Sequence, residues 1–531
     1  MKTEEAFNVF LDAFIEKVKE KSVALQKASW ELETTGSKQA AENATLLSKE
    51  LKLLFSNEET YQKLQEWQKE GTITSPDLLR ILNLLIKKHK VNLVPEELLK
   101  SISKLETKVS QTYINFRANF EDKEVTENDL LDILKTEQDA ERRKAAWNVT
   151  KEVGETMAPL LLELVKKRNE LAHRLGYSDY YQMKLDVDEV DKKWLFQFLD
   201  EFDQATKEEY STLLKEIDSN LAEKYNTTNT AIGPWAWKDP FCQEDPLAST
   251  NLDSILENED IVKLGKQFYD SMEFDVDDIL SRSDLFERKG KNQHAFCTNL
   301  DREDDIRTLC NIRPNIRWLE TIIHELGHAV YEKGYDKDLH WYLKTPPHMI
   351  TTEAVALITG RHAHDATFLK DISNDPQIDE KINEASQSLK RRQLIFSRWV
   401  LVMVHFEAAL YANPEQDLNN LWWTTVQKYQ KICPSSYRGG KQDWACKCHF
   451  GIAPVYYHSY LLGEFFASMI KAHFQEINKS PSMYKQPSCA KFLKEKLFFP
   501  GNRTRWDRLI QMMMGEPLQF KSWIKDFCDQ T

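Results

Sequence analysis

Apolar residues recur at spacings of three and four positions along most of the chain, and charged residues fill many of the positions between them. Residues 1 to about 110 show this pattern in "AENATLLSKELKLLF" and "SPDLLRILNLLIKKHK", and residues 125 to 225 continue it. This spacing places the apolar side chains on one face of an α-helix. Helical spacing resumes at residue 316 and runs nearly to the end. The pattern therefore predicts an all-α fold built from long helices.

Several residues mark expected helix boundaries. Thr126 opens the segment "TENDLLDIL", and Asp129 follows three residues later, where the partner in a capping box stands. In the next helical stretch we expect a break at Pro159 and a C-terminal cap at Gly176.

Two segments depart from the helical pattern. Residues 226–250 contain three prolines and two tryptophans, which predicts a long but ordered irregular crossover. In residues 294–312, the runs "HAFCTNL" and "DIRTLCNI" flank a polar turn, which predicts a β-hairpin. The sequence shows no internal repeat and no clear linker. We expect one large α-helical unit over residues 1–531, with two lobes and an N-terminal helical region at residues 1–110.

Composition excludes several classes of function. Glycine (16) and proline (17) are scarce in 531 residues, which favours helices over tight hairpins. The net charge of −13 argues against a nucleic-acid partner and gives no attraction to anionic membranes. No run of 18 apolar residues is present, so we expect no membrane-spanning segment.

The N-terminal segment and the cysteines bear on the compartment. Glu4, Glu5 and Asp12 stand where a signal peptide would be apolar, so we read the first residues as an amphipathic helix. The eight cysteines are scattered along the chain, unlike those of a small disulfide scaffold. We therefore expect a cytoplasmic protein. We also expect a monomer.

The segment "TIIHELGHAV" at residues 321–330 carries the clearest chemistry. Burying His324, Glu325 and His328 in an apolar helix without partners would be costly. Residues four apart lie on the same face of a helix, so both histidines can bind one metal ion. Glu325 lies one step round the helix, where it can reach a water molecule as general base. The spacing predicts a zinc site.

A catalytic zinc site requires a third protein ligand. Glu353 is the strongest candidate, because it is a carboxylate among the apolar residues of the following helix. His348 is a weaker rival, and Glu332 is expected to face solvent. Two further histidines near the end of the second helix are expected at the surface: His362 and His364.

"HELGH" and "EAVAL", separated by 24 residues, resemble the gluzincin metallopeptidases. The blocks "QHAFCTNLDREDDIRTLC" and "KCHFGIAPVYYHSYLLGEFF" are similar to segments of the angiotensin-converting-enzyme family of peptidyl-dipeptidases (M2). "YYHSYLLGE" also resembles the thimet oligopeptidase family (M3). The resemblance implies an all-α fold of two lobes beside a deep cleft, with N-terminal helices as a lid.

The resemblance implies roles for specific residues. The family's zinc ligands and general base fall on His324, His328, Glu353 and Glu325. Its substrate-binding histidine falls on His294, and Ala295 beside it would offer backbone groups to the peptide. The remaining matches are Lys447 for the substrate's carboxylate, His449 for the transition state, Tyr460 as oxyanion donor and Tyr457 as its companion, with Tyr456 as a competitor for the oxyanion role.

Four positions depart from the family pattern. Trp237 replaces a glutamine that helps the lysine to bind the C-terminal carboxylate, and Leu357 replaces an aspartate near the third zinc ligand. The arginine of the family's chloride site is missing from "YYHSY", so chloride activation is doubtful. Gln293 replaces the cysteine that would pair with Cys310.

Together these residues predict a zinc metallopeptidase that hydrolyses short peptides. Lys447 favours a dipeptidyl carboxypeptidase, whereas Trp237 favours an oligoendopeptidase on the same scaffold. A catalytically silent peptide-binding protein is a third hypothesis, and the retained base Glu325 argues against it.

Overall fold

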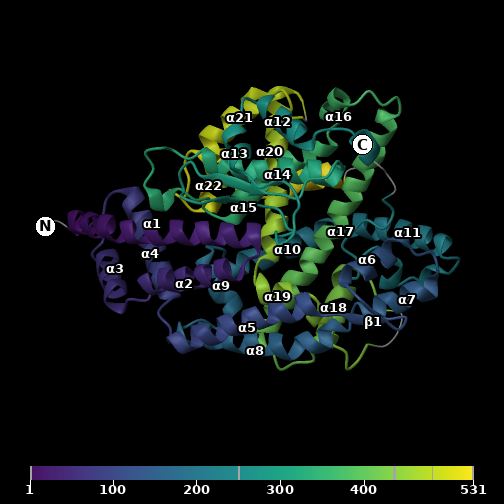
Figure 1. The fold of residues 1–531 in the computed structure, drawn as a ribbon, viewed down its shortest axis with the longest axis horizontal. Coiled ribbons are helices and arrows are strands. Elements are labelled where there is room, and N and C mark those ends of the chain that lie inside the picture. Colours follow the sequence, from purple (N-terminus) through teal and green to yellow (C-terminus); the bar gives the residue numbers. More distant parts are fainter. Residues whose placement is uncertain (1–2, 249–251, 435–437, 481, 529–531) are drawn as a thin grey trace. The chain divides into compact units, whose positions relative to one another are not determined.

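The computed structural model describes residues 3–248, 252–434, 438–480 and 482–528, and most of these residues lie in helices (Figure 1). Two antiparallel hairpins are the only sheets within these ranges, so the predicted all-α class is confirmed. The chain forms two compact units, each assembled from separate segments. Unit 1 comprises residues 1–93, 250–385 and 462–523, and unit 2 comprises residues 94–249, 386–461 and 524–531.

Unit 1 begins with four helices and continues with the segments that carry the His-Glu-x-x-His sequence. Its elements are α1 (Thr3–Thr35), α2 (Lys38–Leu54), α3 (Glu58–Glu70), α4 (Pro76–Lys90), α12 (Ile261–Asp270), α13 (Asp277–Arg282), β3 (Phe296–Asn299), β4 (Ile306–Leu309), α14 (Ile316–Lys333), α15 (Met349–Gly360), α16 (Ala366–Ile372), α21 (Pro487–Leu493) and α22 (Trp506–Met514). A π-helical turn, Lys494–Phe498, follows α21.

Unit 2 holds the middle of the chain. Its elements are α5 (Glu96–Asn115), β1 (Ala118–Phe120), β2 (Lys123–Val125), α6 (Glu127–Thr136), α7 (Ala140–Val149), α8 (Val153–Arg174), α9 (Tyr180–Val187), α10 (Lys192–Ala205), α11 (Lys207–Lys224), α18 (Leu418–Tyr429) and α19 (His449–Ile452). Three further helices contribute residues to both units: α17 (Ile378–Ala412), α20 (Tyr457–Asn478) and α23 (Lys521–Phe527).

The N-terminal helices of unit 1 share one hydrophobic core. Apolar residues from one face of α1 pack against residues from α3 and α4 and against the segment that follows α14. The fully buried members include Phe7, Leu64, Ile81, Leu85 and Leu343. The three- and four-residue spacing in this part of the sequence therefore identified a buried face correctly.

Among the described helices, α17 alone is long and apolar enough by composition to cross a membrane. Of its most apolar 18-residue window, 83% is buried inside the protein. Trp399, Val400 and Met403 are fully buried there. Core helices show this combination of length, composition and burial.

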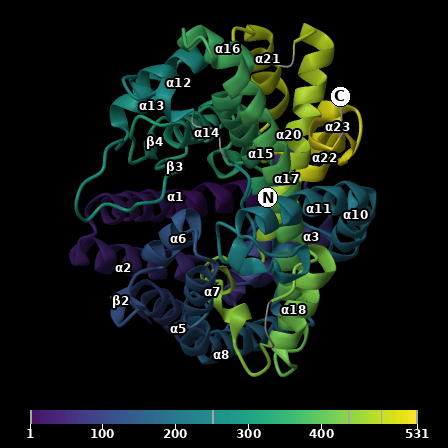
Figure 2. The same ribbon diagram turned by 90° about the vertical axis from the view of Figure 1, so that its right-hand side faces the viewer.

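The predicted hairpin is present, although its strands are shorter than the two sequence runs. β3 and β4 pair antiparallel with Phe296 opposite Leu309 and Asn299 opposite Ile306, and they lie beside α14 (Figure 2). A second hairpin, β1–β2, was not predicted. Its turn residues Glu121 and Asp122 both adopt positive φ, as a tight hairpin turn requires.

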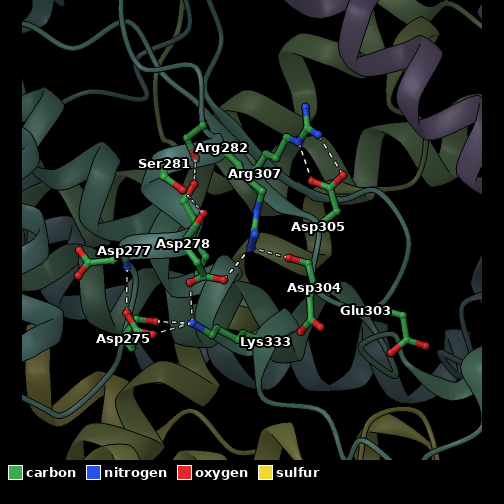
Figure 3. Close-up of polar contacts among 12 residues, drawn as sticks. Asp275, Asp277, Asp278, Ser281, Arg282, Glu303, Asp304, Asp305, Arg307 and Lys333 are labelled. Carbon is green, nitrogen blue, oxygen red and sulfur yellow. Dashed lines mark hydrogen bonds and ion pairs between the residues drawn. The ribbon is translucent and has the colours of Figure 1, made fainter.

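Ion pairs and hydrogen bonds fasten the β3–β4 hairpin and α14 to α13 (Figure 3). Lys333, the last residue of α14, donates to Asp278 Oδ1 over 2.6 Å and to the Asp275 carbonyl over 2.9 Å. Arg282 donates to Asp278 Oδ2 and to the carbonyl of Asp304, in the hairpin turn, over 2.6 Å each. Asp278 therefore binds both Lys333, at the end of α14, and Arg282, whose side chain holds the hairpin turn.

The expected helix boundaries are confirmed in two of three cases. Thr126 and Asp129 form a reciprocal capping box at the start of α6. Gly176, with φ of +84°, follows the end of α8 in the left-handed conformation typical of helix C-termini. The break expected at Pro159 is wrong, because Pro159 lies inside α8. The buried residues Met157 and Leu161 hold that turn in place despite the missing N–H group.

Candidate metal centre and active site

Helices α14 and α15 bring the three predicted metal ligands together. His324 and His328 lie one turn apart on α14, and Glu353 lies near the start of α15. Each histidine Nε2 lies 3.9 Å from the same Glu353 carboxylate oxygen, Oε2. One ligand atom from each of the three residues falls within 4.8 Å of the others. These side chains face a common point.

A close backbone approach between the two helices makes this convergence possible. A Cβ atom on Gly327 would lie 2.6 Å from Thr359 Oγ1 and 2.8 Å from Ala356 Cα, which is closer than any side chain allows. Gly360 is less tightly enclosed, because its Cβ would be 3.2 Å from the Cβ of His324. A larger residue at Gly327 would push α15 and its glutamate away from the histidines.

The neighbouring Thr352 orients His328. Its Oγ1 lies 2.7 Å from His328 Nδ1, and burial, reinforced by nearby His324, lowers the pKa of His328 well below its usual value. With its proton on Nδ1, neutral His328 donates to Thr352 and keeps the Nε2 lone pair towards Glu353. The threonine thus supplies an outer hydrogen bond at a site where Leu357 replaces the family's aspartate. This role of Thr352 was not predicted from the sequence, where its place directly before Glu353 is the one signal that could have pointed to it.

The donor set fits a zinc ion. Two neutral imidazoles and one carboxylate are a common catalytic zinc set, with bonds of about 2.0–2.2 Å that place neighbouring ligand atoms roughly 3.3–3.5 Å apart. Side-chain adjustments of about half an ångström would close the observed 3.9 Å distances to that value. Glu353 is 8% exposed, and a metal cation would compensate for its burial.

Glu325 lies beside the ligands with a shifted pKa. It is only 7% exposed, and burial raises the pKa of its carboxyl group to about 7, with a further contribution from Glu353. His324 and the backbone N–H of Cys297 on β3 oppose this shift, because both favour the charged form. The hairpin therefore touches the candidate base directly, and the carboxyl group has a pKa suited to proton transfer near neutral pH.

The structure corrects the expectation that three nearby residues lie at the surface. Glu332 is partly buried and accepts hydrogen bonds from Asn299 Nδ2 (3.2 Å) and Tyr335 Oη (3.0 Å). His362 is 5% exposed, and its Nε2 accepts the Met483 N–H over 2.9 Å. His364 is half-buried 3.0 Å from a glutamate oxygen of α14. Helix positions alone did not reveal these neighbours, which come from other parts of unit 1.

His348 has a structural role at the start of α15. It is the N-cap residue of that helix, and its Nδ1 accepts the backbone N–H of Ile350 over 3.1 Å. Glu353 converges with His324 and His328, whereas His348 does not belong to this cluster of ligand atoms. This arrangement favours the glutamate as the third ligand.

His294 and Ala295 lie just before β3 rather than within the strand. His294 is exposed, and its backbone N–H donates to Asn292 Oδ1 over 2.9 Å. Asn292 in turn donates its N–H to the carbonyl of Glu33 in α1. The end of α1 thus fixes the segment that leads into the hairpin. Gly36 and Gly290, both at positive φ, allow the two backbones to approach closely there.

The other predicted site residues belong to unit 2. Lys447 Nζ lies 4.9 Å from the ring centroid of Phe241 and 5.3 Å from that of Trp399. Burial lowers its pKa, and none of the described residues forms an ion pair with it. A cation above two aromatic rings, with no carboxylate paired to it, is well placed to receive an anionic group.

His449 and the tyrosines form a cluster at the start of α20. The His449 ring lies 5.1 Å from that of Tyr457, and the Tyr460 ring lies 5.6 Å from Tyr457 and 5.0 Å from Tyr456. Tyr457 is 4% exposed and packs against Trp399, whereas the other two tyrosines are only partly buried. Their greater exposure makes Tyr460 and Tyr456 better placed than Tyr457 to meet a ligand.

Trp237 lies in the irregular crossover, which is ordered over its described part, residues 226–248, as predicted. Arg143 donates to the carbonyls of Trp235, Ala236 and Trp237 and so fixes this loop. The Trp237 side chain is 1% exposed. Residues 249 and 250 lie outside the described part of the chain.

All eight cysteines are free thiols in the structure, including Cys310. The free state of Cys310 agrees with the presence of Gln293 where the family has the partner cysteine.

A helical fold with His-Glu-x-x-His on one helix and a glutamate on the next defines a metallopeptidase of the gluzincin class. The chain belongs to peptidase family M3, whose model matches residues 133–527. A second model, described as angiotensin-converting enzyme, matches residues 1–234. Both resemblances seen in the sequence are therefore confirmed, and the M3 match is the longer one.

Two curated proteins are similar to the chain. Carboxypeptidase 1 of Bacillus subtilis (strain 168) is 27% identical over 271 residues, covering 44% of this chain and 52% of the relative. Angiotensin-converting enzyme of Mesocricetus auratus is 23% identical over 448 residues, covering 74% of this chain and 32% of the relative. The chain therefore spans about half of the first relative and a third of the second.

We expect Glu353→Gln to lose zinc and Glu332→Gln to retain it. An amide is a much poorer zinc ligand than a carboxylate, so zinc affinity should fall by more than the roughly 10–100-fold that outer hydrogen-bond partners cost. Zinc content after dialysis, measured by elemental analysis, is the test. Loss of zinc in Glu332→Gln with retention in Glu353→Gln would show that the third ligand is misassigned.

We expect Thr352→Val to weaken zinc binding about 10–100-fold, because His328 loses the hydrogen bond that orients it. Thr351→Val is the matched control, since the adjacent Thr351 hydroxyl binds Tyr331 and the His348 carbonyl instead. Competition with a chromophoric chelator gives both affinities. Equal affinities in the two variants would mean that Thr352 has no role in orienting the ligand.

Proposed function

We propose that the protein hydrolyses peptide bonds in short peptides with a zinc ion held by His324, His328 and Glu353. The observation that carries this proposal is the convergence of two histidines and a buried glutamate, with Glu325 beside them. Membership of a peptidase family supports it.

When bound, zinc would supply Lewis-acid polarisation of the scissile carbonyl and would make water more acidic. Glu325 would accept the proton of the attacking water molecule and deliver it to the leaving amine. A carboxyl group with a pKa of about 7 can do both near neutral pH. The backbone N–H of Cys297 would keep the carboxylate oriented during both transfers.

For the unit 2 residues we propose the roles that the family resemblance implies. His449 and Tyr460 would donate hydrogen bonds to the developing oxyanion. Lys447 would bind the C-terminal carboxylate of the substrate, which its position above two rings without an ion-pair partner supports. In unit 1, the exposed His294 and the backbone of Ala295 would hold the extended peptide beside the hairpin.

We infer that the enzyme releases dipeptides from the C-terminus. Lys447 supports binding of the C-terminal carboxylate, and the name of one similar protein, carboxypeptidase, supports action at that end of the peptide. An oligoendopeptidase is the second candidate, because the buried indole of Trp237 cannot replace the family glutamine at the carboxylate.

The free thiols support a reducing compartment such as the cytoplasm. We also propose that the protein acts as a monomer.

We expect Glu325→Gln to reduce kcat for an internally quenched peptide by about 10²–10⁴-fold, the usual contribution of general acid–base catalysis. Zinc content should be unchanged, because Glu325 is not a ligand. Glu332→Gln, a similar change one turn beyond His328, should retain activity. A Glu325→Gln variant as active as the natural protein would disprove the assigned role.

We expect Lys447→Met to raise KM for a peptide with a free C-terminus about 10–100-fold, because a charged hydrogen bond is lost. The same peptide with an amidated C-terminus should be a poor substrate for both proteins. The products, separated by mass, should be successive C-terminal dipeptides. If the natural protein cleaves the free and amidated forms equally, it is an endopeptidase on this scaffold.

A further inference from the structure

The turn between α19 and α20 connects residues with different proposed roles. His449 begins α19, Tyr457 begins α20, and Tyr460 follows one turn later. Residues 453–456 join the two helices. The conformation of this short turn therefore sets how the His449 ring faces the tyrosines, which it approaches to 5.1 Å at Tyr457.

Val455 holds the turn in a strained conformation. Its φ is +58°, in the left-handed region that β-branched residues rarely adopt. The side chain is 2% exposed. Residues in such conformations persist only where surrounding contacts determine the backbone, and they are concentrated at functional sites.

Glu407 of α17 supplies one of these contacts. Its Oε1 accepts the backbone N–H of Val455 over 2.9 Å, and its side chain is 2% exposed. Burial raises the pKa of this carboxyl group to about 8, although the Val455 N–H and Arg168 favour the charged form. The mechanism proposed above gives this buried carboxylate no task.

Arg168 of α8 holds the other side of the turn. Its guanidinium donates to the carbonyl of Phe450 over 2.8 Å and to that of Gly451 over 2.6 Å. It also binds Tyr411 Oη over 3.1 Å and Glu106 over 2.7 Å. Arg168 is 1% exposed. Two buried charged groups from separate helices therefore fix the backbone on both sides of residues 453 and 454.

We propose that Glu407 and Arg168 are positioning residues that hold the strained turn at Val455 and so fix the orientation of His449 relative to Tyr457 and Tyr460. Neither residue is assigned contact with the substrate. The role in catalysis rests on the function proposed above, whereas the role in holding the turn does not.

The test combines removal of the carboxylate with relief of the strain. Glu407→Ala should lower kcat by at least about tenfold with KM changed less than threefold, because misplaced groups weaken transition-state contacts. Val455→Gly should remove the need for the carboxylate, since glycine adopts positive φ freely. The double variant Glu407→Ala/Val455→Gly should therefore recover most of the lost kcat.

Two controls separate positioning from stability. Glu407→Gln keeps an oxygen acceptor for the Val455 N–H and should retain kcat within a few-fold. Asp179→Ala removes another buried carboxylate of unit 2, which accepts the N–H of Gln182 over 2.7 Å at the start of α9. It should lower the melting temperature without lowering kcat. Zinc content should be unchanged in all variants.

Hydrogen–deuterium exchange tests the turn without reference to catalysis. In the natural protein, a peptide covering residues 450–457 should exchange slowly at the Val455 amide. Glu407→Ala should increase its exchange, and Asp179→Ala should not. If the natural protein cleaves no peptide but shows this exchange pattern, the proposed function fails and the role in holding the turn stands.

Three results would overturn the proposal. One is unchanged kcat in Glu407→Ala. Another is a loss of kcat that Val455→Gly fails to rescue, because Glu407 would then act through some other contact. The third is exchange at residues 450–457 that does not respond to removal of Glu407.

Discussion

The close contact between α14 and α15 at Gly327 is the constraint on which the metal centre depends. The absence of a side chain at Gly327 lets the Ala356 backbone approach until Glu353 lies 3.9 Å from two imidazoles. Glu325 and Glu353 are both buried at this centre, and the β3 backbone at Cys297 also contacts Glu325. Burial keeps His328 neutral and raises the pKa of Glu325. The α14–α15 contact therefore sets the distances between the ligands, and burial of the site sets the protonation of His328 and the basicity of Glu325.

Much of this centre could be predicted from the sequence, because its rules are local. Residues four apart share a helix face, which paired His324 with His328, and a carboxylate among apolar residues singled out Glu353. The orienting hydroxyl of Thr352 and the hydrogen-bonded state of Glu332 could not be predicted. Both depend on which helix or strand packs against α14, and helical spacing within one segment does not contain that information.

The helix boundaries show the same difference between features set by neighbouring residues and features set by tertiary packing. The capping box of Thr126 and Asp129 involves only neighbouring residues, and it was predicted correctly. Pro159 was expected to end a helix because of a local rule, but α8 continues through it. Tertiary burial of Met157 and Leu161 outweighs one missing hydrogen bond there. Local rules thus hold where local contacts dominate and fail where burial is strong.

The two groups of site residues are held by different physical means. In unit 1, regular helices with glycine contacts fix the ligands, because a metal ion tolerates only small errors in distance. In unit 2, the chain must turn sharply within four residues between α19 and α20, so regular structure is unavailable. A valine at positive φ makes the turn, and the buried charges of Glu407 and Arg168 hold it. Valine gives no sign of this conformation in the sequence, whereas glycine at the same place would have suggested a turn. The strained valine with its buried partners holds the turn in one conformation and so provides a fixed orientation for His449.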